Sequence, residues 1–309
     1  MLRMIAGRIA VGTFVVWGAT TLMFVLIRLA PGDPAGVLLG PDATADEIAA
    51  LRERLGLGGS AIEQYFAYLS QIITLDFGES FRNGLPAMQV VLSRLPATVQ
   101  LTLAATVVAV VVGLGLGMIA ARRPDGVVDR IVSTISIMFQ GMPTFWVGIM
   151  LILLVALVLR LTPSSGAGTF QHLILPAVTL SLPFTAIIAR VSRATLTESM
   201  QEPYIQTALA KGLTRSEALS GHALRNSLGA VVTIIGLQIG ALLGGAVVVE
   251  NVFAWPGLGT LVVQSVSNRD YAVVQAAVLL IAFIVLVLNL LADIANALLD
   301  PRIRRGAPA

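Results

Sequence analysis

Few residues in this sequence have the types and spacing that catalytic or metal chemistry needs. The chain of 309 residues holds no cysteine and two histidines, His172 and His222, which fit no metal-ligand spacing. The one lysine, Lys211, lies in a polar segment, which disfavours a buried Ser–Lys dyad, and no Gly-x-Ser-x-Gly or His-Glu-x-x-His pattern occurs. A Gly-x-x-x-x-Gly-Lys phosphate loop is also missing. We therefore expect no catalytic residue, no metal site and no bound cofactor, with a membrane-embedded hydrolase as the weaker alternative.

A second group of polar residues lies within long apolar stretches. Polar side chains are costly inside a bilayer and often line a transport pathway there, and proline bends a helix. The candidates for pore lining are Gln100, Gln140, Pro143, Gln238 and Asp293. Asp293 has a structural alternative near the inner interface, and Pro143 is equally compatible with passive packing.

The elements that position these residues are apolar runs. The chain is 56% hydrophobic and 12% charged, with a mean hydropathy of +0.88. About 20 apolar residues cross a bilayer as a helix, and continuous rather than alternating hydrophobicity favours helices over barrel strands. We predict an all-α membrane protein with six transmembrane helices: one within 1–30, then 96–121, 131–159, 173–191, 228–249 and 272–295.

Charge sets the orientation. Cationic loops stay in the cytoplasm, and the segments 122–130 and 190–225 are net positive, whereas 33–94 is net negative. Both termini, including a short tail after 295, are therefore predicted to be cytoplasmic. Of the 20 cationic residues 19 are arginine, mainly at helix ends and in loops, which indicates topology determinants in contact with lipid and not a nucleic-acid surface.

Two connections are long enough to be structured. In the outer insertion, 31–95, the capping-box patterns Thr44–Glu47 and Ser60–Glu63 predict helices near Ala45–Leu55 and Ala61–Thr74, and a third short helix is expected near Ala87–Leu95. This insertion either shields the spans or docks an external partner. The remainder, 96–309, forms the core with the other five spans.

The inner connection, 192–227, which we call the coupling loop, is the more informative of the two. A helix-prone stretch ends at Gly212, and Thr214 begins a second short helix with Glu217 three residues on. Such a loop can transmit a push from a soluble partner into the spans, although an interfacial or re-entrant segment is the alternative. The candidate contact residues are Tyr204, Gln206, Thr207, Ala208, Ala210, Lys211, Gly212, Thr214, Arg215 and Glu217.

Glycines repeat at helical spacing in the fifth span. Gly236, Gly240 and Gly244 have the small-xxx-small spacing that lets two helices approach closely, within the chain or between two permease chains. The glycines at 113–117 lie in a span with no strand before it, so they do not form a dinucleotide-binding loop.

At these residues the chain resembles permease subunits of binding-protein-dependent ABC importers, in the dipeptide and oligopeptide branch. The family's Glu-Ala-Ala-x-x-x-Gly signature is matched by Gln206, Thr207, Ala208 and Gly212, with the first two residues replaced. Further motifs similar to this branch lie along nearly the whole chain: Pro31–Pro34, Gly78 and Ser80, Arg94–Thr98, Tyr204–Leu213, His222–Asn226, Glu250–Gly259, Arg269–Tyr271 and Leu299–Arg304.

The resemblance implies a type I ABC importer fold in a bacterial cytoplasmic (inner) membrane. It implies a homologous second permease subunit, two ATPase domains or subunits that bind ATP and Mg, and an extracytoplasmic substrate-binding protein. Peptides are the leading substrate class, with nickel, glutathione, haem and other small solutes carried by similar subunits. A secondary transporter driven by ion gradients is the alternative, but such folds usually show more spans and paired buried charges.

Overall fold

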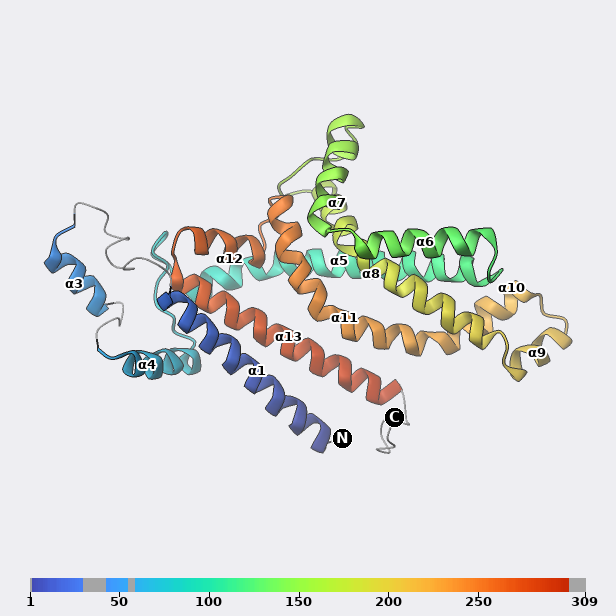
Figure 1. Ribbon diagram of the computed structural model, residues 1–309, viewed down its shortest axis with the longest axis horizontal. Helices are drawn as coiled ribbons and strands as arrows, with labels where there is room; N and C mark the ends of the chain where they lie inside the picture. The colour runs from blue at the N-terminus through green and yellow to red at the C-terminus, as the bar shows by residue number, and fades with distance from the viewer. Residues whose placement is uncertain (1, 30–42, 55–58, 300–309) are drawn as a thin grey trace. The chain divides into compact units, whose positions relative to one another are not determined.

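The computed structural model describes residues 2–29, 43–54 and 59–299. In these segments the chain is helical apart from turns and one isolated bridge between Glu79 and Pro86. The elements are α1 (Leu2–Leu29), α3 (Ala45–Arg54), α4 (Ala61–Thr74), α5 (Ala87–Ala121), α6 (Val127–Gly141), α7 (Thr144–Leu151), η1 (Ile152–Val158), α8 (Phe170–Ser199), α9 (Pro203–Ala210), α10 (Arg215–Glu217), η2 (Ala218–Ala223), α11 (Leu224–Val252), α12 (Leu258–Ser267) and α13 (Tyr271–Leu299), where η marks a π-helix (Figure 1).

By length and apolar composition, four unbroken helices among the described residues can cross a membrane. They lie within Ala6–Leu29, Ala87–Ala121, Phe170–Ser199 and Tyr271–Ile294. Two helix pairs, Val127–Gly141 with Thr144–Val158 and Arg215–Gln238 with Gly240–Val252, are long and apolar enough only when taken together, and each pair is bent. Counting each pair as one span gives the six predicted crossings.

The predicted third span is not one straight helix. Its two halves meet at 107°, and the break falls at Met142 and Pro143, both of which have extended backbone. Proline has no amide hydrogen to donate into the preceding turn and disfavours helical geometry in the residue before it. The sequence indicated an interruption at Pro143, and in the structure this interruption is a bend of 107° between the two helices.

Pro96, in contrast, does not interrupt its helix. The predicted short helix Ala87–Leu95 and the second span are one continuous helix, α5, with Pro96 inside it. The fixed φ of proline is helical, and a long helix can continue through the loss of one backbone hydrogen bond. The boundary expected between 95 and 96 is therefore no break in secondary structure.

The described residues form two compact units, and the larger consists of 96–260 and 285–299. In this unit α8 is central, packing against α6, α7 and α11, and Figure 1 shows α6, α8 and α11 running alongside one another. Its core is built around buried Leu101, Ile188, Val249 and Phe253.

Contacts between α5 and α8 depend on two glycines. A methyl group on Gly113 would lie 2.8 Å from the Ile188 side chain, and one on Gly117 would lie 2.6 Å from Ser192 Cβ. The two helix backbones therefore approach as closely as small residues allow. This contact is made by glycines of the second span, whereas the small-xxx-small pattern in the sequence lies in the fifth span.

The second unit comprises 2–29, 43–54, 59–95 and 261–284. Here α4 packs against the end of α1: Arg28 donates from Nε and Nη2 to Gln64 Oε1 at 3.0 and 2.6 Å, and its guanidinium lies 3.4 Å from the centre of the Phe24 ring. Tyr68 stacks on Phe24, and burial raises the pKa of its hydroxyl to about 12. The phenol is therefore neutral at physiological pH.

Candidate coupling loop and its polar anchors

The coupling loop contains a short helix, α9, that is followed by a glycine in left-handed conformation. Helix α9 starts with Pro203 at its first position. At its end, Gly212 N donates to Leu209 O at 3.0 Å and Leu213 N to Ala208 O at 3.3 Å, which is the Schellman pattern. Gly212 has φ of +94°, a conformation that side chains with a Cβ rarely adopt. The chain therefore turns sharply at the position where the sequence predicts it.

A capping box starts the next helix. Thr214 Oγ1 accepts from Glu217 N at 3.3 Å, while Thr214 N donates to Glu217 Oε2 at 2.8 Å. The Thr214 hydroxyl, which donates to Glu217 Oε2 at 2.7 Å, and the Thr214 amide lower the pKa of the Glu217 carboxyl, because both bonds favour its charged form. The turn between α9 and α10 is thus fixed at both ends by local hydrogen bonds.

One side of the coupling loop is anchored in an apolar cluster. Ile205 is fully buried. It shares the cluster with Ala121 at the end of α5, with Leu196 and Met200 at the end of α8, and with Ala218, Leu219 and Ala223 of η2. The loop is therefore packed onto the ends of the two long helices α5 and α8.

The opposite side of the loop is open to solvent. Nine of the ten candidate contact residues are exposed, and Ala208 is half-buried. This surface presents the cationic Lys211 and Arg215 beside the anionic Glu217. An exposed polar surface on a packed base is an arrangement that a soluble partner can press against.

An ion pair joins α6 to α8. Arg193 Nε donates to Asp129 Oδ1 at 2.9 Å and Arg193 Nη2 to Asp129 Oδ2 at 2.5 Å. The Asp129 side chain is 3% exposed, the Arg193 side chain 30%. Asp129 also accepts from Asp125 N at 2.8 Å. In the sequence both charges indicate only membrane topology, because a contact between residues 64 positions apart leaves no local signal.

A buried carboxylate organises the end of α11. Glu250 is fully buried. It accepts hydrogen bonds from Thr98 Oγ1 at 2.6 Å, from Gly259 N at 2.7 Å and from Thr260 N at 3.2 Å. Thr98 Oγ1 in turn accepts from Leu258 N at 2.8 Å. The carboxylate therefore ties α5 to the turn between α11 and α12.

Small residues make room for this carboxylate. A Cβ on Gly257 would collide with the Glu250 carboxyl group, and one on Gly259 would collide with the backbone of Val247. Trp255 Nε1 adds a second link to α5 by donating to Ala97 O at 2.9 Å. The motif Glu250–Gly259, noted in the sequence only as a resemblance, is physically a carboxylate with the backbone donors and space that it needs.

The five pore-lining candidates lie on different elements. Gln140, near the end of α6, accepts from Arg190 Nη1 of α8 at 3.3 Å, and Pro143 is at the bend before α7. Gln100 is exposed on α5, and Gln238 and Asp293 are half-buried on α11 and α13. Of the three glycines in the fifth span, Gly236 and Gly240 face α13, at Ala292 and Val285, whereas a Cβ on Gly244 would meet no atom within 4 Å.

Some resemblance motifs lie outside the described residues. They are Pro31–Pro34 and, apart from the helical backbone of Leu299, the string Leu299–Arg304. The other strings named above fall within the description.

Comparison with known proteins identifies relatives of this chain over most of its length. A probable peptide ABC transporter permease protein, y4tP, of Sinorhizobium fredii is 41% identical, over 91% of this chain and 93% of the relative. The glutathione transport system permease protein GsiC of Escherichia coli K12 is 40% identical, over 92% and 93%.

Solved structures share the fold at lower identity. An inward-facing MetNI methionine ABC transporter chain matches with a TM-score of 0.58 and 21% identity, over 69% of this chain and 97% of that one. An amino acid ABC transporter crystallised with histidines matches with a TM-score of 0.51 and 18% identity, over 69% and 94%. Both support the type I permease fold.

The family comparison covers both ends of the sequence. Residues 1–102 match the N-terminal region of binding-protein-dependent transport system membrane components, and residues 113–305 match their inner membrane component. With two relatives near 40% identity and the helical fold above, the chain belongs to the family of inner-membrane permease subunits of binding-protein-dependent ABC importers.

Proposed function

We propose that this chain forms half of the pathway of an ATP-driven importer for small peptides, and that separate ATPase subunits act on it through the coupling loop. The observation that carries the proposal is the loop itself: its turn is fixed by a Schellman motif and a capping box, its base is buried, and its polar face is exposed. A loop of fixed shape transmits displacement, whereas a flexible one absorbs it.

The proposal assigns ATP and Mg to partner chains. Four components are expected beside this chain: a homologous second permease subunit, two ATPase domains or subunits, and a substrate-binding protein on the outer side. The peptide class rests on the relative named as a probable peptide permease. Glutathione is a second candidate, because another relative of similar identity is named for its transport.

Purification of the tagged chain in gentle detergent tests this assembly. We expect mass spectrometry to find a second permease and ATPase subunits, and we expect the purified complex to hydrolyse ATP. Uptake of radiolabelled dipeptide and of glutathione by the complex with its binding protein then identifies the substrate class. A homo-oligomer without ATPase activity would contradict the proposal and favour the secondary transporter.

Substitution at Gly212 tests the role of the loop. Its φ of +94° costs an L-residue about 1–2 kcal/mol, although a Cβ there would meet no atom within 4 Å. We expect Gly212→Val to lose most ATP-driven uptake while inserting normally into the membrane. Gly212→Asn should retain more uptake, because asparagine tolerates positive φ better than valine.

The readouts for Gly212 are uptake into membrane vesicles and the amount of ATPase that co-purifies. Gly221→Val is a matched control, because a Cβ there also meets no atom within 4 Å but the φ is not positive. Full uptake by Gly212→Val with normal ATPase assembly would show that the shape of the turn is not required.

A further inference from the structure

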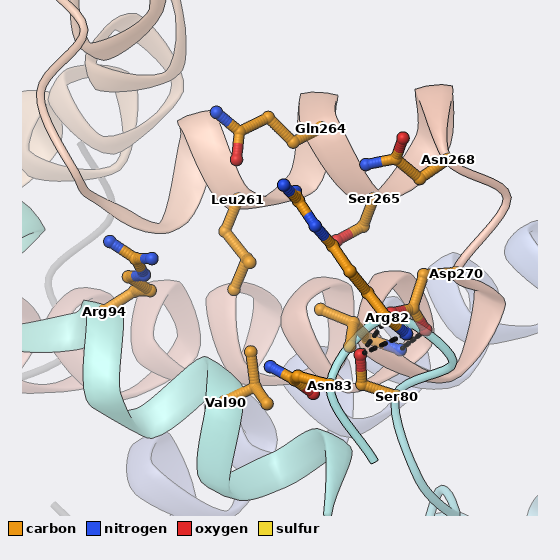
Figure 2. A pocket seen from close by; sticks show the side chains of 11 residues that line it. Ser80, Arg82, Asn83, Val90, Arg94, Leu261, Gln264, Ser265, Asn268 and Asp270 are labelled. Atoms are coloured by element: carbon orange, nitrogen blue, oxygen red, sulfur yellow. Dashed lines mark hydrogen bonds between the residues drawn. The ribbon is translucent and has the colours of Figure 1, made fainter. Parts of the chain in front are cut away.

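A pocket lies within the second unit, on the predicted outer side of the membrane. It has a volume of about 320 Å³ and is formed by the turn before α5, the start of α5, α12 and the start of α13 (Figure 2). Its lining residues are Ser80, Arg82, Asn83, Val90, Arg94, Leu261, Gln264, Ser265, Asn268, Asp270 and Val273. The site is polar along most of its wall, unlike the apolar faces of the surrounding helices.

The charges of this pocket are unbalanced. Arg82 and Arg94 contribute two guanidinium groups, and among the described residues neither has a carboxylate within salt-bridge distance. The single acid, Asp270, is buried and accepts a hydrogen bond from Ser80 Oγ at 2.5 Å. Two arginines thus face a cavity in which the only carboxylate already has its own donor.

The turn that carries Arg82 is held in place before any ligand arrives. Ser80 N donates to Leu85 O at 2.8 Å and Gly84 N to Ser80 O at 2.9 Å, so that the turn closes on itself. The Ser80–Asp270 hydrogen bond fastens the turn to the start of α13. Figure 2 shows the Arg82 side chain extending from this turn toward Gln264 and Ser265 on α12. The backbone of the site is therefore preorganised.

The chemistry of the wall selects an anionic group. Guanidinium forks match the geometry of a carboxylate and bind it through paired hydrogen bonds. The amide side chains of Asn83, Gln264 and Asn268 supply further donors and acceptors at the same cavity. The volume of the pocket is at the lower end of the range for small-molecule sites. This space is larger than one carboxylate side chain fills, and it is suitable for a small organic acid.

We infer that this pocket receives the carboxylate of the transported solute on the outer side of the membrane, before the solute enters the pathway. The inference rests on the proposed function, because it takes the solute to be a peptide or similar molecule with a free carboxylate. Arg82 and Arg94 hold the carboxylate, and the three amides contact the rest of the solute. An acidic side chain of the binding protein is the competing occupant.

A single engineered thiol can report on this pocket, because the chain holds no cysteine. Gln264→Cys places a thiol on the pocket wall, and its labelling by a membrane-impermeant maleimide is measured in the assembled complex in right-side-out vesicles. The probes are L-Ala-L-Ala and its C-terminal amide, which lacks the carboxylate. We expect the free dipeptide to slow labelling several-fold, and the amide to leave it unchanged.

Removing the two guanidinium groups should abolish this difference. In the Gln264→Cys background, R82Q/R94Q should weaken protection by the free dipeptide about tenfold or more, because each lost hydrogen bond to a charged group contributes about 1.5–3 kcal/mol. The control Arg160→Gln removes a guanidinium group from an exposed position on the predicted outer side that does not line the pocket, and it should leave protection intact. If R82Q/R94Q does not assemble, Arg82→Lys retains the charge without the fork and should weaken protection less.

Three outcomes would overturn the inference. Equal protection by the free dipeptide and its amide would exclude recognition of the carboxylate. Protection by the ligand-free binding protein, lost in R82Q/R94Q, would make the pocket a protein-docking contact. Uptake of the dipeptide without protection of the thiol would exclude the pocket as the carboxylate site, while the proposed function would stand. If the complex imports no peptide but S-methylglutathione protects the thiol, the peptide proposal fails and the pocket stands.

Discussion

Replacing Glu250 with alanine is expected to destabilise the folded chain by about 3 kcal/mol or more. The substitution leaves the Thr98 hydroxyl and the amides of Gly259 and Thr260 without their shared acceptor in a fully buried site. Each buried donor left unsatisfied costs about 1–3 kcal/mol, and the cavity left by the side chain adds to the loss. The measurement is thermal denaturation of the purified chain in detergent, where the midpoint should fall by several degrees.

Two variants separate the hydrogen bonds from the shape of the site. Glu250→Gln keeps the volume and one acceptor oxygen, so it should lose less stability than Glu250→Ala. Glu198→Ala removes an exposed acid of α8 and should change stability by less than about 0.5 kcal/mol. If Glu250→Ala has the same denaturation midpoint as the unmodified chain, the carboxylate does not stabilise the turn between α11 and α12.

The second large effect is expected at Arg193. Arg193→Ala leaves Asp129, with its side chain 3% exposed, without the cation that donates to both of its oxygens. Breaking a buried ion pair by removing one partner typically costs about 3–5 kcal/mol, and the partial exposure of Arg193 places this variant at the lower end. The same denaturation measurement applies.

The same helix offers a matched control for Arg193. Arg190, three residues earlier on α8, is exposed, and its bond to Gln140 is 3.3 Å long, so Arg190→Ala should change stability little. The double variant D129N/R193Q removes both charges and should recover part of the loss, because no buried charge is then left alone. Equal stabilities of Arg190→Ala and Arg193→Ala would contradict the prediction.

Features encoded by neighbouring residues were predictable from the sequence. The helix starts at Ser60 and Thr214 are confirmed, with both reciprocal hydrogen bonds of each capping box present. The turn at Gly212 is confirmed by its positive φ. Apolar runs predicted the membrane helices because bilayer thickness sets their length. Each of these signals is local, so a single sequence contains it in full.

Features that depend on distant partners could not be predicted. Glu250 follows an apolar run, and nothing near it indicates that Thr98, 152 residues earlier, donates to it. The same holds for Asp129 and Arg193. The glycine spacing in the fifth span was visible, but which glycines face a neighbouring helix depends on how the helices pack: an added Cβ would lie 2.6 Å from its nearest neighbour both at Gly236 of the fifth span and at Gly117 of the second.

The π-helix η2 joins the coupling loop to α11, and its wider turn has a consequence for how the sequence can change. A π-helical turn holds one more residue than an α-helical turn, so removing one residue from Ala218–Ala223 would convert η2 to ordinary helix. Because the wider turn takes up the extra residue within about the same rotation, the loop would keep its orientation relative to α11 after this deletion. A deletion within the regular part of α11 has a different effect, because each α-helical residue turns the chain by about 100° and everything before it would rotate by that angle. The segment Ala218–Ala223 is therefore a place next to the loop where the sequence can lose one residue without turning the exposed face away.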